Sequence, residues 1–249
     1  MTSLDVVVVF LSSQPLESTD TTWLIFLRWI HLAAGITWVG LLYFFNLVNI
    51  PLMRELDPAT RGKVVPLMLP RALWWFRWAA VITVLAGITY WMHIGAANAR
   101  NANASAGRAF GSFFVIWIVA WFVQYLLIKT EIVRGWLLGI AMALVMFGAS
   151  WIFLYLNSHG WESNRLLAIG VGGGMGMLML LNVWGVIWRA QKRLIAWTLD
   201  NAVNGTPMPA QAAALSRQVL VTSRTNFWLS FPMLFFMAAA SHYPLFART

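Results

Sequence analysis

Cysteine is absent from this chain of 249 residues. Its absence excludes disulfide bonds, zinc sites built on thiolates, iron–sulfur clusters and the Cys-x-x-Cys-His attachment of c-type haem. Any cofactor that this chain holds must therefore rely on histidine, methionine or carboxylate ligands, or on no ligand bond at all.

Charged residues are also scarce. They make up 10% of the chain and hydrophobic residues 60%, whereas an ordinary soluble domain has about 25% charged residues. A chain of this composition is stable only where most of its surface faces lipid, so the sequence predicts an integral membrane protein in contact with the lipid bilayer.

The long apolar runs of the sequence contain no aspartate and no glutamate. Ion pumps and cation transporters usually place such carboxylates within their membrane helices, where the residues carry protons or bind the ion. Their absence argues against a carboxylate-driven pump or transporter.

Six apolar runs are long enough to span about 30 Å of hydrocarbon. They predict an all-α fold, a bundle of about six transmembrane helices that forms a single membrane domain over residues 1–249. Sixteen tryptophans, many of them near the ends of the runs, are typical of aromatic belts at membrane interfaces. The predicted spans are roughly 22–50, 72–96, 109–128, 135–157, 165–188 and 226–246.

Basic residues are distributed unevenly between the two sides of this bundle. Eleven lie on the side of segments 51–71, 129–134 and 189–225, and four lie toward the opposite side. By the positive-inside rule the basic side is cytoplasmic, so both termini face outward, and we expect a multi-pass protein of the bacterial inner membrane. The topology explains the net charge of +9 without a nucleic-acid partner.

Two cytoplasmic segments are amphipathic. The sequence predicts an interfacial segment with short helical turns over 51–71. In 189–225, it predicts a helix that continues past the bilayer and then a second amphipathic helix from about Ala210 to Thr222.

The first run carries four strongly polar residues, Arg28, His31, Asn46 and Asn49. At about 100° per residue, all four lie within about 60° of His31 on one helix face, which we expect to point into the bundle. Two interpretations are open. The residues hydrogen-bond neighbouring helices, with Arg28 reaching the interface, or they line a pocket in which His31 is a ligand and Arg28 balances a carboxylate.

The four histidines of the chain, His31, His93, His159 and His242, all fall toward the outer side of the predicted topology. His31 and His242 are predicted to lie in the first and last helices at similar depth, which makes them the best pair of iron ligands for one haem b. A proton relay and a hydrogen-bonded packing pair are the alternatives. His93 and His159 are expected to be interfacial and solvated.

The fifth run contains the glycine-rich stretch 170-GVGGGMGMLMLLN-182. The pairs Gly170/Gly174 and Gly172/Gly176 predict the close approach of another helix or of a flat cofactor.

Four blocks of the sequence together resemble a known family. In order and spacing they are similar to the membrane domain of bacterial membrane-bound urate hydroxylases, the urate oxidase N-terminal domain family. The blocks are 28-RWIHLAAGITWVGLLYFFN-46, 74-WWFRWAAVITVLAGITYW-91, 176-GMLMLLNVWGVIWRAQKR-193 and 226-NFWLSFPMLFFMAAASHYP-244.

The resemblance implies a redox role. In that family a c-type cytochrome domain commonly follows the membrane domain, and the two are thought to oxidise urate and pass electrons to the respiratory chain. Here we expect a separate c-type cytochrome, because these residues contain none. His31 and His242 carry over as the family's histidines. Ala79 and Leu167–Ile169 stand where the family pattern has a glutamate and a histidine.

Two functions follow. The first is a membrane redox protein that oxidises a small substrate, or relays electrons near the periplasmic face to the cytochrome, with His31, His242 and Arg28 as the cofactor-binding residues. The second is a non-catalytic accessory subunit of a larger respiratory or monooxygenase complex, which fits the scarcity of ionisable residues and the abundance of tryptophan.

Overall fold

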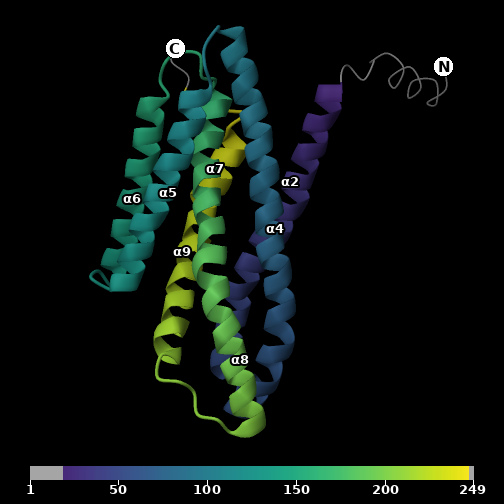
Figure 1. The fold of residues 1–249 in the computed structure, drawn as a ribbon, viewed down its shortest axis with the longest axis vertical. Coiled ribbons are helices and arrows are strands. Elements are labelled where there is room, and N and C mark those ends of the chain that lie inside the picture. Colours follow the sequence, from purple (N-terminus) through teal and green to yellow (C-terminus); the bar gives the residue numbers. More distant parts are fainter. Residues whose placement is uncertain (1–18, 247–249) are drawn as a thin grey trace, which may run out of the picture.

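The computed structural model of the protein describes residues 19–246, and within that range it contains helices and no strands. Two π-helical segments, η1 and η2, continue directly from α-helices (Figure 1). The elements are α2 (Thr19–Tyr43), η1 (Phe44–Asn49), α3 (Ile50–Glu55), α4 (Pro58–Asn101), α5 (Gly107–Thr130), α6 (Trp136–Leu156), α7 (Asn164–Asn182), η2 (Val183–Ile187), α8 (Trp188–Asn204) and α9 (Ala212–Ala239).

Five helical stretches of the described chain are long and apolar enough to cross a membrane, which confirms the prediction of an all-α membrane bundle. The sixth predicted span, 226–246, is not among them. The stretches are Thr22–Glu55, Pro58–Asn101, Gly107–Thr130, Trp136–Leu156 and Asn164–Asn204.

The predicted boundaries of the last helix are wrong at both ends. In place of a short amphipathic helix followed by a separate span, α9 is one helix over Ala212–Ala239. The polar stretch in its middle does not interrupt it, and the Thr225 hydroxyl there donates to the Val221 carbonyl within the helix. The helix ends at Ala239, and residues 240–242 form a turn ahead of Pro244.

The first half of α4 also differs from the prediction. The predicted short turn is present at the start of the segment, as the six-residue helix α3, but from Pro58 the segment belongs to α4, which continues to Asn101 with two prolines inside it. The Asp57 carboxylate caps its start by accepting from the backbone N–H groups of Ala59 and Thr60 at 2.9 and 3.0 Å. Hydrogen bonds from Thr60 lower the pKa of Asp57 below its ordinary value.

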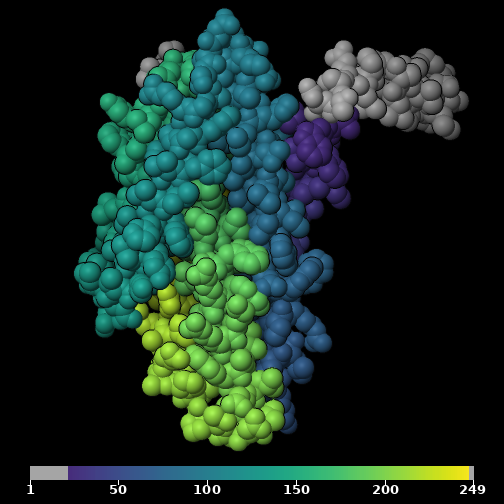
Figure 2. All heavy atoms as spheres, viewed as in Figure 1, coloured from purple at the N-terminus to yellow at the C-terminus, as the bar shows by residue number. Residues whose placement is uncertain are grey.

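Close packing on α8 supports the proline-containing part of α4. A Cβ on Gly62 would lie 2.9 Å from the Cβ of Ala202, so the two helices touch backbone to side chain at this point. Figure 2 shows α8 between α4 and the first turns of α9 on the face in view.

The two ends of the bundle are distinct. The start of α2, the loop between α4 and α5 and the end of α9 lie at one end, and the loop between α8 and α9 lies at the other (Figure 1). The lower parts of α4 and α8 reach beyond the loop that joins α5 and α6. This extension agrees with the prediction that the fifth helix continues past the bilayer.

The helix α7 lies at the centre of the bundle and α2 at its edge. α7 packs against α4, α5, α6 and α9, and most of its residues are buried. α2 packs chiefly against α4, and its outer face is exposed, as at Trp29 and Ile36. A cavity lies between α2 and the helices α4, α7 and α9.

Candidate functional site

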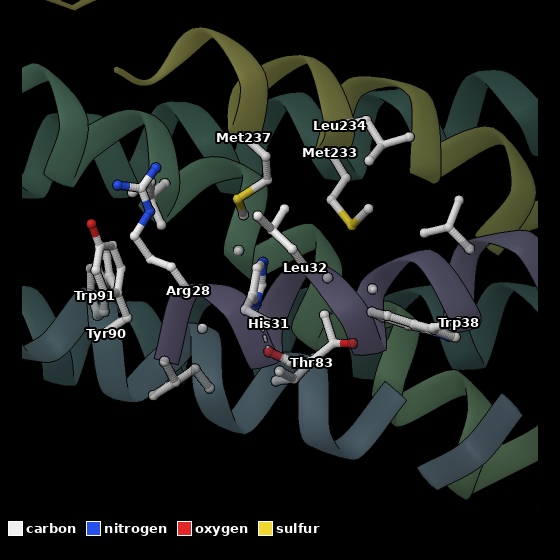
Figure 3. Close-up of a pocket in the computed structure, with 18 of the residues that line it drawn as sticks. Arg28, His31, Leu32, Trp38, Thr83, Tyr90, Trp91, Met233, Leu234 and Met237 are labelled. Atoms are coloured by element: carbon white, nitrogen blue, oxygen red, sulfur yellow. Dashed lines mark hydrogen bonds between the residues drawn. The ribbon is translucent and has the colours of Figure 1, made fainter. Parts of the chain in front are cut away.

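A cavity of about 490 Å³ lies between α2, α4, α7 and α9, with one residue of α5 in its wall (Figure 3). Its volume is within the range of small-molecule and cofactor sites. Most of its lining is apolar. The lining residues that carry polar side-chain atoms are Arg28, His31, Trp38, Tyr43, Thr83, Tyr90, Trp91, Arg165 and Ser241.

His31 is fixed in this cavity from the side of α4. Its Nδ1 lies 2.8 Å from the backbone carbonyl oxygen of Thr83. Because a carbonyl only accepts, Nδ1 carries a proton and donates, and in the neutral ring Nε2 is left with its lone pair. The ring rests on Gly87, where a Cβ would lie 2.8 Å from both Nδ1 and Cε1.

Trp38 contributes a second polar group. It is 1% exposed, it lines the cavity, and its Nε1 has no hydrogen-bond partner. A buried N–H normally finds an acceptor, because leaving it unpaired costs free energy. The indole N–H is therefore available to an acceptor in the cavity.

Arginines gather at the outer end of the cavity. Figure 3 shows Arg28 and Tyr90 at one end and Trp38 at the other, with His31 between them. The Arg28 and Arg165 guanidinium carbons lie 5.9 and 5.2 Å from the centre of the Tyr90 ring. Arg165 also donates a hydrogen bond to the Tyr90 hydroxyl.

The opposite wall is built by α9 and the glycines of α7. Met233 and Met237 line the cavity, and Figure 3 shows both side chains reaching from α9 toward the space beside His31. Gly173 and Gly176 lie beneath them, with the methyl carbon of Met237 and the sulfur of Met233 in ordinary contact distance of a Cβ at these positions.

The other glycines of α7 serve helix packing. A Cβ on Gly170 would overlap the Phe153 ring of α6, and one on Gly174 would overlap the Trp117 ring of α5. Gly172 lies against Phe236 of α9 in the same way. The glycine-rich stretch thus packs against three helices and also forms part of the cavity wall.

The polar face predicted on the first helix divides into two parts. Arg28 and His31 line the cavity. Asn46 lies in η1 and donates to the Ser223 hydroxyl of α9 at 3.1 Å, and Asn49 is buried beside it in the same segment. The outer half of the face thus belongs to the cavity and the inner half to helix contacts.

The structure does not bring His242 to His31. The prediction that His242 lies within the last helix is wrong, because α9 ends at Ala239 and His242 lies in the following turn, where its backbone N–H donates to the Ala239 carbonyl. The side chain is exposed and does not line the cavity, whereas Ser241 does. His159 hydrogen-bonds Glu162 at 2.8 Å, away from the cavity lining.

The sequence did not single out several residues that complete the site. Trp38, Tyr90, Arg165, Met233 and Met237 come from four helices far apart in the chain. Arg165 lies at a helix border, and the two methionines are one turn apart within an apolar run. Both features are also common where side chains only pack, so the sequence did not mark these residues as part of a site.

The donor set bears on what the cavity can hold. Within residues 19–246 no group of three or more His, Cys, Asp or Glu side chains is placed to hold a metal ion. A metal already chelated by a ring needs only one or two axial ligands from the protein. A histidine nitrogen with a free lone pair, methionines on the facing wall and glycines along it fit such a ring.

Comparisons with known proteins give one match. The sequence model of the urate oxidase N-terminal family matches residues 58–249, most of the chain. α2, with Arg28 and His31, lies outside the matched residues. No curated protein and no solved structure matches the chain.

Proposed function

Since the chain belongs to the urate oxidase N-terminal family, we propose that it is a membrane redox protein that binds haem b in the cavity beside His31. Its role is to pass electrons near the outer face of the membrane to a separate c-type cytochrome. Haem b, when bound, would supply one-electron chemistry that no side chain of this chain provides. Every other part of the proposal concerns the residues around the cavity.

The observation that carries the proposal is the hydrogen bond that fixes the His31 ring. Metal-ligating histidines almost always donate their second ring N–H to a carboxylate or a backbone carbonyl, which fixes the tautomer and the ring orientation. His31 makes this bond to the Thr83 carbonyl, and Gly87 leaves room for the ring to reach it. The nitrogen that remains, Nε2, would be the ligand to the iron of a bound haem.

A methionine of α9 would supply the second ligand to a bound haem. Met233 and Met237 line the cavity on the wall that faces His31, and methionine with histidine is a known axial pair for haem iron. His242, which the sequence suggested for this position, is exposed in the turn after α9.

The position of the cavity supports electron transfer on the outer side. By the positive-inside rule we expect the basic ends of the helices to be cytoplasmic, and Arg28, Tyr90 and Arg165 lie toward the other end of α2, α4 and α7. A c-type cytochrome matures outside the cytoplasm, so its haem would meet the bundle on that side.

A difference spectrum of the purified protein tests the proposal. We expect a reduced-minus-oxidised band of the b type in the wild type and its loss in His31→Ala. Met233→Leu and Met237→Leu are expected to identify the second ligand, because only the substitution that removes the ligating methionine should shift the absorbance band. His93→Ala is the matched control, since His93 lies in α4 outside the cavity lining.

The alternative hypothesis gives a different result. An accessory subunit would show no chromophore after haem supplementation and would purify stably with other membrane subunits. That outcome would reject haem binding.

A further inference from the structure

Three residues from three helices meet at the outer end of the cavity. They are Arg28 of α2, Tyr90 of α4 and Arg165 of α7. Both guanidinium groups lie within 6 Å of the centre of the same phenol ring, and Arg165 also donates to its hydroxyl. Tyr90 thus contacts both cations at one end of the cavity.

Among the described residues, no carboxylate pairs with either arginine. The ion pairs in the described part of the chain are Arg134–Glu131, Arg217–Glu131 and His159–Glu162, and none includes Arg28 or Arg165. A cation–π contact with tyrosine is attractive, but it supplies no negative charge. Since both guanidinium groups lie near the same ring, an anion bound against them would supply the negative charge that the ring does not.

Arg165 adds an unpaired buried donor. Its Nε is buried and has no hydrogen-bond partner, although the hydrogen bond from another of its nitrogens to Tyr90 holds the side chain in place. A buried guanidinium nitrogen without an acceptor is costly, and charged residues within membrane segments usually mark a binding site or ion path.

We propose that Arg28 and Arg165 form an anion clamp that binds a carboxylate of the ligand in the cavity, with Tyr90 as the positioning residue. The fork of an arginine matches the two oxygens of a carboxylate, and such charge-assisted bonds are about twice as strong as neutral ones. The chemical class of ligand is a planar, apolar ring that carries carboxylates at one edge. This clamp rests on the proposed function for the identity of the ring, since the carboxylates of haem b are of this kind.

The clamp and His31 have separate roles. His31 acts on a metal, whereas the two arginines act on the acid groups, so an iron-free ring tests the clamp alone. Protoporphyrin IX carries two carboxylates and no metal, and its dimethyl ester carries neither carboxylate nor metal. The ratio of the dissociation constants of the diacid and the ester measures how much the carboxylates contribute to binding.

The experiment uses the full chain in an uncharged detergent, with fluorescence titration of each porphyrin. We expect the wild type to bind the diacid about tenfold or more tightly than the ester. Arg28→Gln and Arg165→Gln are each expected to weaken the diacid about tenfold and to leave the ester unchanged. Arg165→Lys should restore part of the loss, because it keeps the charge and loses the fork.

Arg100→Gln is the matched control. Arg100 is an exposed arginine at the same end of α4, outside the cavity lining, and its loss removes one positive charge without touching the clamp. Its diacid-to-ester ratio should equal that of the wild type. Tyr90→Phe keeps the ring and removes the hydroxyl that holds Arg165, so it should reduce the preference for the diacid. Adding Arg28→Gln to this variant should reduce the preference further, because Arg28 does not depend on the hydroxyl.

The outcomes separate the clamp from the haem proposal. If the wild type binds neither porphyrin, or binds acid and ester equally, or if Arg165→Gln and Arg100→Gln behave alike, the clamp is overturned. A parallel titration with haemin reports on His31. A diacid preference that depends on both arginines, with no histidine-ligated spectrum for haemin, would uphold the clamp and reject His31 as the ligand.

Discussion

His31 shows how a single side chain is set by the backbone of another helix. Its ring is fixed by one hydrogen bond to a carbonyl of α4 and by the missing Cβ of Gly87 one turn further along that helix. Neither contact involves a side chain with chemistry of its own. A histidine held this way has a fixed tautomer, and its second nitrogen faces the cavity rather than a packing partner.

Gly87→Ala is expected to displace the His31 ring. The new Cβ would lie 2.8 Å from two ring atoms, so the ring must leave the Thr83 carbonyl. Loss of such a supporting hydrogen bond typically weakens metal affinity by about 10-fold or more. Absorbance titration with haemin measures the change.

Gly40→Ala is the matched control for that substitution. Gly40 also lines the cavity, but nothing lies within 4 Å of a Cβ placed there. Its haemin affinity should equal that of the wild type. Equal affinities for the wild type, Gly40→Ala and Gly87→Ala would show that the His31–Thr83 bond does not support ligation.

At the scale of elements, a buried amide network joins α7 to its neighbours. The Asn182 side-chain oxygen accepts from Trp121 at 3.1 Å and from Gln124 at 2.9 Å, both on α5. Its nitrogen donates to Asn226 of α9 at 2.7 Å, and Asn226 in turn donates to the Met179 carbonyl of α7 at 3.0 Å. The network lies where α7 passes into the π-helical η2. Polar side chains at such positions hold membrane helices together.

Asn182→Leu is expected to destabilise the bundle. The substitution leaves the amide groups of Gln124 and Asn226 without this partner, and both side chains are fully buried. We expect a loss of about 2 kcal/mol, because each buried polar group left unpaired costs about 1–3 kcal/mol. Unfolding in dodecyl sulfate, followed by far-UV circular dichroism, measures it.

Asn201→Leu provides the comparison for that loss. Asn201 is an exposed asparagine of α8 whose amide donates to the Thr206 carbonyl at the following turn. Its replacement should change stability by about 0.5 kcal/mol or less. Similar unfolding curves for both variants would mean that the network contributes little.

At the scale of the whole molecule, the charge distribution and the shape of the bundle predict the same orientation across the membrane. The α8–α9 loop and the lower parts of α4 and α8 form one end of the bundle (Figure 1), and this end carries most of the lysines and arginines. The opposite end holds the start of α2 and the loop from α4 to α5. The positive-inside rule therefore predicts that the α4–α5 loop is external.

Single cysteines are expected to report this orientation without background, because the chain has none. Ser105→Cys lies in the exposed loop between α4 and α5, and Thr206→Cys lies in the exposed loop between α8 and α9. A membrane-impermeant maleimide should label Ser105→Cys in intact cells and Thr206→Cys only after the membrane is opened. The reverse pattern would invert the topology and move the cavity mouth to the cytoplasmic side.

The sequence by itself determined the class of the protein. Apolar runs and scarce charge predicted the membrane bundle, and five of the predicted spans correspond to helices that are long and apolar enough to cross a membrane. Periodicity also placed Arg28 and His31 on one inward face, and both line the cavity. These properties are local, since they depend on composition and on positions a few residues apart along one helix.

Only the tertiary structure decided what completes the site. Arg165, Tyr90 and the methionines of α9 reach the cavity because α7 packs against both α4 and α9 while α2 packs on α4 at the edge of the bundle, and no spacing along the chain encodes that arrangement. The same packing separated His242 from His31, since α9 ends before His242. It also divided the polar face of the first helix, because the partner of each residue depends on which helix lies opposite. The sequence thus fixes which face points inward, and the neighbouring helices decide what that face meets.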